Sequence, residues 1–480
     1  MRDLKSFSFT NWSDNASSAE GWWVYASDQV TALDGNDVIQ TASDGWIGDG
    51  PIEIEGSLDL GNGNDTLIGL CNENIGKFWD GIRIEEQGML RTGSGYDKII
   101  GLGGDYGIVN NGFIGTSVGN DLISTAEGYS RNGIVNRQQG TISTGTGDDI
   151  IRAMGSESVA LVNEGIIDTG DGKDQIVGGD GQKVGAGIVN SAYILMGAHD
   201  DLISASGKID GFNNVSPAFV NCASGHDAIH ASGSRTGLGN QGTLYLGPGD
   251  DSIVTRSSQY AINNSGIIDT DYGNDTLRAT SISPGSLSPV LNNQSGGVIT
   301  LGDGVDLISV NSVNSSIGLQ NKGRIDTGSG SSRIQVVGGK SFGIINESGG
   351  IINNGSSFDF IGIVEGGLFQ NDGLITCGNG SDVVSSLNGG FSGDGTIDLG
   401  PGDDVLEGIA KVYSAKALYK GGSGFDRLGF KTGTYSVVDQ GGGRYLIGGT
   451  MNVVGFEGFT DAASFLNLPA AAAQGYVVFR

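Results

Sequence analysis

One short motif, Gly-x-Gly-x-Asp followed by an apolar residue, returns along most of this 480-residue chain. Gly145–Asp149 and Gly400–Asp404 are two of its copies. Successive copies lie 22 to 32 residues apart, with a mean near ~26, which is within the range of solenoid repeats. In a solenoid each repeat packs only against its neighbours, so the length of the chain does not require several globular domains. The sequence therefore predicts one stack of similar coils.

The aspartate that closes the motif forms a nearly complete row. Ser332 takes its place once, and Asp359 follows an irregular copy, so the row marks sixteen turns. The other members are Asp37, Asp65, Asp97, Asp121, Asp149, Asp174, Asp201, Asp227, Asp251, Asp275, Asp306, Asp382, Asp404 and Asp426.

Each repeat also holds three short apolar segments, which in one copy are Ala160–Val162, Ile166–Ile167 and Gln175–Val177. Segments this short, bounded by Gly, Asn and Asp, are typical of strands. The 88 glycines interrupt nearly every window of ten residues, which argues against helices, while 7 prolines are too few for collagen. We expect an all-β fold, a single-stranded parallel β-helix (β-solenoid) of about sixteen coils with N- and C-terminal caps.

The two ends lack a clear repeat and are predicted to be caps, which a solenoid needs to cover its open core. Residues 1–30 form the N-terminal cap, residues 31–428 the β-solenoid repeats, and residues 429–480 the C-terminal cap, a candidate secretion or assembly element. Trp22 and Trp23 in the first cap leave a second interpretation open, a platform on which sugar rings stack.

An asparagine follows the first strand of most repeats, and we expect these residues to stack into a ladder that fixes the register of the coils. The predicted members are Asn110, Asn136, Asn163, Asn190, Asn221, Asn240, Asn263, Asn292, Asn321, Asn346 and Asn371.

The composition bears on the partners, the disulfides and the location of the protein. With 54 acidic and 26 basic residues, the net charge of −28 disfavours nucleic acid and anionic lipid and favours cations. Three cysteines far apart imply no disulfide framework. No apolar run is long enough to span a membrane, and residues 1–30 contain no apolar segment after a basic start, so we expect no classical signal peptide.

The chemistry of the motif suggests calcium. Glycines allow a tight turn with accessible carbonyl oxygens, and the aspartate adds a carboxylate. Ca²⁺ takes six to eight oxygen ligands, which two turns on neighbouring coils supply together. All aspartates of the row except Asp359 are therefore candidate metal ligands. The alternative is a plain turn in which the aspartate only caps its own backbone.

The motif resembles the glycine-rich RTX nonapeptide, Gly-Gly-x-Gly-x-Asp-x-U-x, where U is a large apolar residue. Leu60–Leu67 and Gly421–Leu428 are the segments most similar to it. RTX proteins bind calcium and are usually exported by a type I system with an uncleaved C-terminal signal. The resemblance thus implies bound Ca²⁺ and an extracellular or cell-surface location reached without a classical signal peptide.

The resemblance covers about residues 31–428, but only the turn matches. RTX repeats follow one another every nine residues and form a narrow roll, whereas this chain has one motif per coil. Val118 stands where a glycine is expected, and Gly355–Phe358 is irregular. The implied structure is a wider β-helix with one row of calcium ions rather than two.

No catalytic constellation emerges. The histidines are His199, His226 and His230. We expect His199 and His226 to stack near one another in successive turns. A histidine in a turn is more often a solvent-facing residue than a general base. The enzymatic alternative is a β-helix lyase, epimerase or depolymerase acting on acidic polysaccharide. It requires acids clustered with basic residues on one strand face.

Ice binding is a further alternative, because a regular solenoid face can present a flat array of threonines. Leucine or methionine takes the same repeat position in other copies, so we expect this position to be partly buried. The two sets are Thr144, Thr169, Thr270, Thr327 and Thr376, and Leu60, Met196, Leu246, Leu301 and Leu399.

The sequence thus favours a non-enzymatic, secreted, calcium-binding structural or adhesive protein. We expect calcium ions as its cofactor, and self-association end to end or laterally, because the ends of a solenoid are strand edges. Cell-surface polysaccharide is a further candidate partner. Nucleic acid and a membrane span are not expected.

Overall fold

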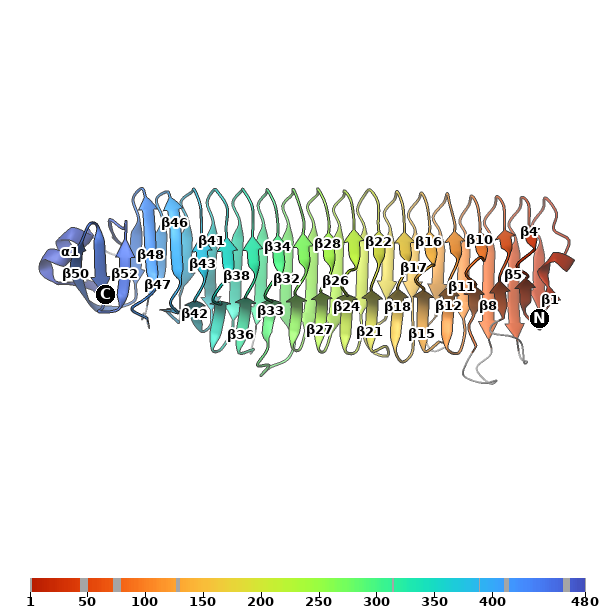
Figure 1. Cartoon of the computed structure of the whole chain (residues 1–480), viewed down its shortest axis with the longest axis horizontal. Helices are drawn as coiled ribbons and strands as arrows, with labels where there is room; N and C mark the ends of the chain where they lie inside the picture. Colours follow the sequence, from red (N-terminus) through yellow and green to blue (C-terminus); the bar gives the residue numbers. More distant parts are fainter. Residues whose placement is uncertain are drawn as a thin grey trace. The chain divides into compact units, whose positions relative to one another are not determined.

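The computed structural model describes residues 2–43, 51–71, 79–126, 130–312, 315–387, 389–409, 414–460 and 467–479. The chain forms two compact units, Met1–Gly247 and Pro248–Arg480. In both units the chain winds as a parallel β-solenoid (Figure 1). The coils contribute short strands to three sheets, here named A, B and C.

Parallel strands make up all three sheets of the first unit. Sheet A contains β1 (Arg2–Asp3), β3 (Trp22–Val24), β6 (Ile52–Ile54), β9 (Ile82–Ile84), β12 (Tyr106–Asn110), β15 (Asn132–Asn136), β18 (Val159–Asn163), β21 (Ala186–Asn190), β24 (Asp210–Asn214) and β27 (Thr236–Asn240). Sheet B contains β2 (Asn15–Ser18), β5 (Val38–Ser43), β8 (Thr66–Cys71), β11 (Lys98–Leu102), β14 (Leu122–Thr125), β17 (Ile150–Ala153), β20 (Gln175–Gly178), β23 (Leu202–Ser206) and β26 (Ala228–Gly233). Sheet C contains β4 (Gln29–Thr31), β7 (Ser57–Asp59), β10 (Met89–Arg91), β13 (Phe113–Gly115), β16 (Thr141–Ser143), β19 (Ile166–Asp168), β22 (Tyr193–Leu195), β25 (Phe219–Asn221) and β28 (Thr243–Tyr245).

The second unit repeats this arrangement. Its sheet A contains β30 (Tyr260–Asn264), β33 (Pro289–Asn293), β36 (Ile317–Asn321), β39 (Phe342–Asn346), β42 (Leu368–Asn371) and β45 (Phe391–Ser392). Sheet B contains β29 (Ser252–Ser257), β32 (Thr276–Ser281), β35 (Leu307–Ser312), β38 (Arg333–Gly338), β41 (Phe360–Glu365), β44 (Val383–Ser386), β47 (Val405–Ile409), β49 (Arg427–Phe430) and β53 (Gly458–Thr460). The parallel part of sheet C contains β31 (Ile267–Asp269), β34 (Val298–Thr300), β37 (Arg324–Asp326), β40 (Ile351–Asn353), β43 (Leu374–Thr376), β46 (Thr396–Pro401), β48 (Leu418–Ser423) and β52 (Met451–Val454).

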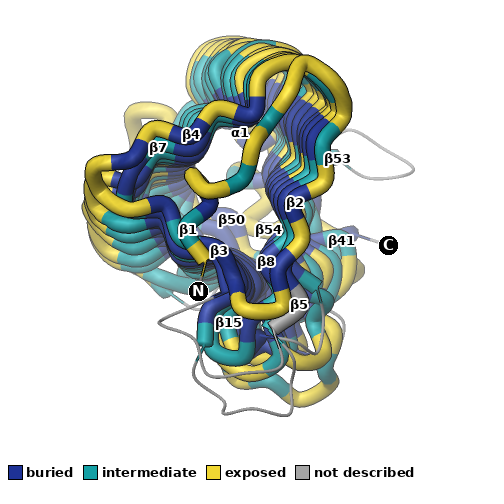
Figure 2. The backbone as a smooth tube through the Cα atoms, turned by 90° about the vertical axis from the view of Figure 1, so that its right-hand side faces the viewer, coloured by how far each residue is buried: buried dark blue, intermediate teal, exposed yellow. Residues whose placement is uncertain are grey.

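Equivalent residues of successive coils stack on one another. In sheet B, Ile99 pairs with Ile123, which pairs with Ile151. All three side chains are fully buried, and the view in Figure 2 shows buried residues along the inner side of the stacked coils. Since successive strand residues point to opposite faces, one apolar residue per short strand is enough to build a continuous core.

The expected fold class is confirmed. Each of the sixteen motif turns lies directly before a sheet B strand, from Asp37 before β5 to Asp426 before β49. The three apolar segments of the copy at Ala160 fall in β18, β19 and β20. The turn motif therefore marks one corner of every coil.

The N-terminal residues already join the coils. β1 pairs with β3, and β2 pairs with β5, all in parallel. Trp22 is 4% exposed, and its Nε1 donates to the carbonyl oxygen of Ala16 at 3.3 Å. Trp23 instead stacks on Tyr25 with ring centroids 4.6 Å apart. Trp22 is thus a core residue, which rules out the paired sugar-stacking platform.

The C-terminal residues depart from the repeat. β50 (Gly433–Gly441) pairs in antiparallel fashion with β51 (Arg444–Ile447) and with β54 (Tyr476–Phe479). Helix α1 (Leu468–Gln474) begins after Asn467, whose Oδ1 accepts the backbone N–H of Ala470, and ends at a left-handed glycine. Residues 1, 461–466 and 480 of the two predicted caps lie outside the described residues, and the domain boundaries stay predictions.

The asparagine ladder exists, with three corrected members. Each Nδ2 donates to the Oδ1 of the next asparagine at 2.8 or 2.9 Å. The predicted Asn221, Asn263 and Asn292 do not belong to it, because Asn221 lies in sheet C and the other two lie one residue too early. The ladder contains Asn110, Asn136, Asn163, Asn190, Asn214 and Asn240 in the first unit, and Asn264, Asn293, Asn321, Asn346 and Asn371 in the second.

Candidate metal-binding turns

The glycines of the motif are required by space as well as by conformation. We name the five positions first glycine, middle residue, second glycine, outer residue and inner aspartate. The second glycine Gly147 has φ +129°, and a Cβ built there would lie 1.8 Å from the carbonyl oxygen of Gly119 in the previous coil. Most turns therefore pack backbone against backbone at a distance that suits glycine. Other residues with positive φ take the first-glycine position in four turns (Leu33, Ser117, Ala223 and Asp271) and the second in two (His199 and Ser357). The replaced glycine before Asp121 is thus at Ser117, and Val118 is a middle residue that pairs with Thr146.

The inner aspartates point away from solvent. All fifteen are 2% exposed or less, since each lies between the turn and the first buried residue of a sheet B strand. A carboxylate buried this deeply is unstable unless it is hydrogen-bonded or paired with a cation.

In fourteen of the fifteen inner aspartates, one carboxylate oxygen accepts a backbone N–H of the preceding coil. The Oδ1 of Asp149 accepts the backbone N–H of Asp121, the inner aspartate of the previous coil, at 2.7 Å. The Oδ1 of Asp174 accepts from Asp149 at 2.8 Å. The same bond recurs along both units, at 2.7 to 2.9 Å. The aspartate therefore accepts a backbone N–H of the neighbouring coil. The plain-turn alternative expected it to bond to the backbone of its own turn.

This row extends beyond the motif at both ends. The backbone N–H of Asp14 donates to Asp37 Oδ1 at 2.7 Å, and Glu457 Oε2 accepts the N–H of Asp426 at 2.7 Å. Sequence reasoning missed Asp14 and Glu457 because neither follows Gly-x-Gly. Their one detectable signal is an acidic residue just before a short strand, Asn15–Ser18 or Gly458–Thr460.

The second carboxylate oxygen has no donor in most of these turns. Two exceptions are Asp275, whose Oδ2 accepts from Thr270 Oγ1 at 2.6 Å, and Asp306, whose Oδ2 accepts from Ser332 Oγ at 3.3 Å. Among the described residues, the buried Oδ2 atoms without a hydrogen-bond partner include those of Asp37, Asp65, Asp97, Asp121, Asp149, Asp174, Asp201, Asp359, Asp382, Asp404 and Asp426.

Burial raises the pKa of these carboxyl groups. Loss of solvent brings the pKa of Asp65, Asp149 and Asp382 to about 7, and that of Asp201 to about 9. The backbone N–H bonds to Oδ1 act in the opposite direction and favour the charged form. Without a cation, the row therefore resists ionisation near neutral pH.

The outer residue supports the turn from the solvent side. Asn120 Oδ1 accepts the backbone N–H of Asp148 at 3.0 Å, and Asp148 Oδ1 accepts that of Lys173 at 3.0 Å. This bond runs to the following coil, whereas the inner aspartate bonds to the preceding one. The frequency of Asn and Asp at the outer position follows from this role, which the sequence alone did not reveal.

The oxygen atoms of the turns are suitable ligands for a hard cation. Carbonyl oxygens of the second glycines add to the unpartnered carboxylate oxygens, since no donor of the described residues reaches the carbonyl oxygen of Gly63 or Gly95. Calcium prefers this mixture of carboxylate and carbonyl oxygen. Within the described residues, however, no three His, Cys, Asp or Glu side chains converge as a metal-binding group. Any ion in these turns depends on backbone ligands in addition to carboxylates.

The structure places all fourteen predicted ligands in one equivalent position. Those from Asp37 to Asp227 belong to the first unit and those from Asp251 to Asp426 to the second. Asp359, excluded from the prediction because its turn is irregular, occupies the same position and accepts the N–H of Ser332 at 2.7 Å. Metal binding by these residues stays a prediction.

The histidines do not stack as predicted. His199 takes the second-glycine position with φ +89°, whereas His226 is an outer residue whose N–H donates to Asp200 Oδ1 at 3.0 Å. The Nδ1 of His199 lies 2.7 Å from the carbonyl oxygen of Ala198 in its own turn. The two residues differ by one position in the turn, so they form no equivalent pair.

The threonine array of the ice-binding alternative is not on the surface. Thr144, Thr169, Thr270 and Thr327 are 2% exposed or less, as are the leucines and the methionine at the same position. Thr144 Oγ1 donates to the carbonyl oxygen of Thr169 at 3.0 Å. Thr376 was assigned to this position wrongly, since Cys377 precedes the first glycine of its turn. The position is buried entirely rather than partly.

Comparisons with known proteins add little. No protein-family model matches the chain, and none of the curated proteins is similar to it. Among solved structures, the chain is similar to a hyperactive, Ca²⁺-dependent, β-helical antifreeze protein from an Antarctic bacterium, at 16% identity over 88% of this chain and 80% of that protein, with a TM-score of 0.25. A likeness this weak supports no inference about the turns or their ligands.

Proposed function

We propose that this chain is a secreted, calcium-binding structural or adhesive protein of the cell surface or extracellular matrix. The observation that supports it is the row of buried inner aspartates, nearly all of which use Oδ1 to accept a backbone N–H and most of which leave Oδ2 without a donor. A row made only for turn structure needs one acceptor per coil, which a neutral asparagine also supplies.

Electrostatics favours a cation in these turns. Stacked coils place neighbouring carboxylates about 5 Å apart, where two ionised groups repel by about 3 kcal/mol at an effective dielectric constant near 20. Inner aspartates of adjacent coils, such as Asp121 and Asp149, would hold the ion together with carbonyl oxygens of Gly119 and Gly147. Bound calcium would supply the positive charge that keeps both carboxylates ionised and the coils together.

Calcium would also restrict folding to the outside of the cell. Because the turns form only in the folded coils, the free energy of ion binding contributes to folding. Such a chain stays poorly folded where calcium is scarce and becomes stable after export. No helix of the described residues has the length and apolarity of a membrane span. The proposal includes self-association, to which the exposed Tyr476 and Val478 of the C-terminal strand β54 would contribute.

Thermal unfolding tests the proposal. Circular dichroism of the whole chain, with calcium and then with excess chelator, should show a large loss of β signal or melting temperature in chelator. Calcium should restore it and magnesium should not, since Mg²⁺ demands a smaller, rigid octahedral site. An unchanged melting curve would contradict calcium binding and leave the inner aspartates as capping residues only.

A further inference from the structure

The outer face of sheet B in the second unit carries one exposed arginine on each of three strands, β29, β32 and β38, and β35 lies between the last two. Along β29, Ile253 and Thr255 point into the core, whereas Arg256 is exposed on the outer side. Arg278 on β32 and Arg333 on β38 are exposed on the same side. We name this surface the arginine face.

The strand register fixes the spacing of the arginines. Arg278 lies beside Val254 of β29 and Ser309 of β35, and Arg333 lies beside Leu307 of β35. With strands about 4.8 Å apart and about 6.6 Å between alternate residues, the Cα atoms of Arg256 and Arg278 are about 8 Å apart, and those of Arg278 and Arg333 about 12 Å. The three residues thus follow one diagonal line across sheet B.

None of these arginines has an acidic partner among the described residues. In contrast, Arg324 of the same unit pairs with Asp326, and in the first unit Arg131 pairs with Glu157 at 2.9 Å. In a chain of net charge −28, three guanidinium groups without a carboxylate mark a local positive surface. Between them lie Ser309, Asn311 and Gln335, which offer hydroxyl and amide groups.

We propose that the arginine face binds an anionic polysaccharide. A guanidinium group binds a carboxylate or sulfate through two parallel hydrogen bonds, and the hydroxyl and amide side chains match the hydroxyl groups of sugars. Arg333 lies over the ring of Phe360, 4.3 Å from its centroid, which adds an aromatic surface beside a charged one.

The spacing favours this partner over other polyanions. Duplex DNA carries one charge per about 1.7 Å of its axis, far denser than the arginines, and the net charge of the chain repels it. A polysaccharide with one charge on every second sugar is sparser and fits a row of separated cations. A protein partner would require a predominantly apolar centre, whereas the half-buried Val254 and Leu307 lie among polar and charged side chains on this face. The inference does not depend on calcium in the turns.

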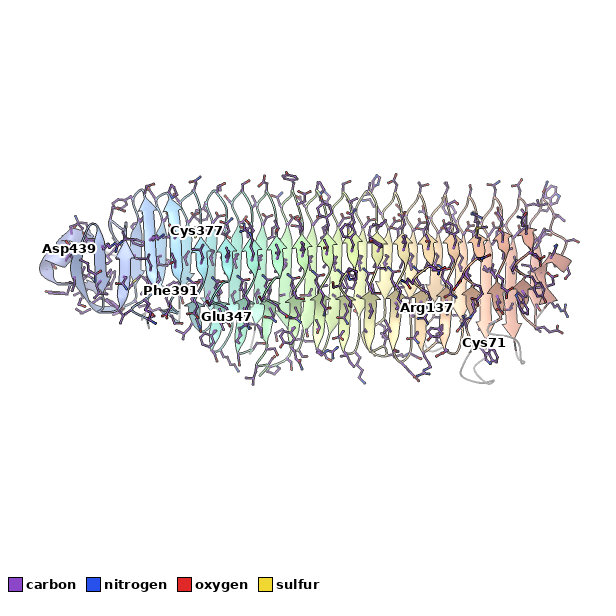
Figure 3. All side chains as sticks on the ribbon, in the orientation of Figure 1. Cys71, Arg137, Glu347, Cys377, Phe391 and Asp439 are labelled. Carbon is purple, nitrogen blue, oxygen red and sulfur yellow. The ribbon has the colours of Figure 1, made fainter. Side chains whose placement is uncertain are left out.

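Binding of hyaluronan, which carries one carboxylate per disaccharide, tests the inference on the full, calcium-loaded chain by titration calorimetry. Neutral dextran is the uncharged probe. The variant Arg256→Gln/Arg278→Gln/Arg333→Gln should bind hyaluronan about tenfold more weakly or worse. The control Arg131→Gln/Arg137→Gln/Arg235→Gln removes the same charge from ion-paired residues of the first unit and should retain binding. Arg131 and Arg137 (Figure 3) flank β15, and Arg235 precedes β27.

Each outcome decides the inference. The inference is wrong if the wild-type protein does not bind hyaluronan, or if it binds dextran or duplex DNA equally well. It is also wrong if both triple variants lose binding to the same extent. A shift to lower mass of the arginine-face variant alone, measured by sedimentation velocity, would assign the face to a second copy of the chain. Circular dichroism should show unchanged calcium-dependent melting in both variants, so this test is independent of the calcium proposal.

Discussion

A typical inner aspartate, such as Asp149, uses its two oxygens differently. Oδ1 holds the neighbouring coil through a backbone N–H, and this bond needs only an acceptor. Oδ2 is buried without a donor in most turns, and an unpaired charge there costs free energy unless it is neutralised. An aspartate retained in fifteen of sixteen turns, where asparagine would satisfy the backbone, indicates that the charge itself has a use.

Replacing one inner aspartate should therefore have opposite effects with and without calcium. The variant Asp149→Asn keeps the acceptor for Asp121 N–H but removes the charge at Oδ2. We expect it to be more stable than the wild type in chelator, by about 1 kcal/mol, and less stable in calcium by a similar or larger amount. Urea unfolding under both conditions measures the two differences.

The adjacent outer residue gives the matched control. Asp148→Asn removes the same charge one residue away, on the exposed side, and keeps the acceptor for Lys173 N–H. Its effect should be small and have the same sign in both conditions. If Asp149→Asn behaves as Asp148→Asn does, the inner aspartate has no metal-linked role.

At the scale of the coil, polar ladders fix the register of the strands. Asn293 belongs to the buried ladder, accepting from Asn264 and donating to Asn321, each at 2.8 Å. Its neighbour Asn292 is half-buried and donates to Asn263 at 2.8 Å, outside the ladder. The two adjacent asparagines should contribute differently to the free energy of unfolding, because losing the hydrogen bonds of a buried amide costs more than losing those of an exposed one.

Alanine at the two positions should separate these roles. Asn293→Ala removes both ladder bonds, from Asn264 and to Asn321. It also removes the donations of Asn293 Nδ2 to the carbonyl oxygens of Gly297 and Arg324, and it should lower the free energy of unfolding by about 1–3 kcal/mol. Asn292→Ala should cost about 0.5 kcal/mol or less. Chemical denaturation of the two variants provides the comparison, and equal losses would contradict the assigned ladder.

The periodicity of the sequence was sufficient to predict the coil, but not to assign every residue of the asparagine ladder and of the threonine position. The recurrent turn located each sheet B strand, since Gly-x-Gly-x-Asp has one backbone solution at that corner. Asn292 and Thr376 were misplaced by one residue, because in a chain so rich in Asn, Thr and Gly neighbouring residues share the same chemistry. Asn292 and Asn293 differ only in the direction of their side chains, which the folded coil determines.

For the whole molecule, the inner aspartates predict an unusual dependence of stability on pH. Without metal, the folded-state pKa of Asp65, Asp149 and Asp382 is about 7, against about 3.9 in an unfolded chain. The folded state therefore binds more protons between these values. The stability due to these groups is fully present below about pH 4 and is lost as the pH rises through about 7.

Melting temperatures measured in chelator between about pH 4.5 and 8 test this dependence. They should fall as the pH rises, the reverse of the usual behaviour of paired carboxylates. In calcium the trend should weaken or invert, because the ion binds the deprotonated groups. A rise of stability with pH in chelator would contradict the buried, unpaired state of these side chains.

The candidate site was only half predictable from the sequence. Carboxylates at a fixed period identified the row, and glycine identified the tight turn. The bond from Asp149 Oδ1 to the preceding coil and the free Oδ2 depend on how coils stack, which no single repeat encodes. Likewise, the arginine face arises from residues on β29, β32 and β38, far apart in sequence and close only through the sheet.

The opposite directions of the two turn bonds bear on how such a chain changes length during evolution. The inner aspartate accepts an N–H from the preceding coil, and the outer residue accepts one from the following coil. Each turn therefore offers the same bonding groups to whichever coil lies next to it. If residues 122–149 were deleted, Asp121 would meet Asp174 just as it now meets Asp149, with its turn still matched. Duplication or loss of whole coils is therefore nearly neutral for the fold, whereas an insertion of one or two residues within a strand disrupts every layer it contacts.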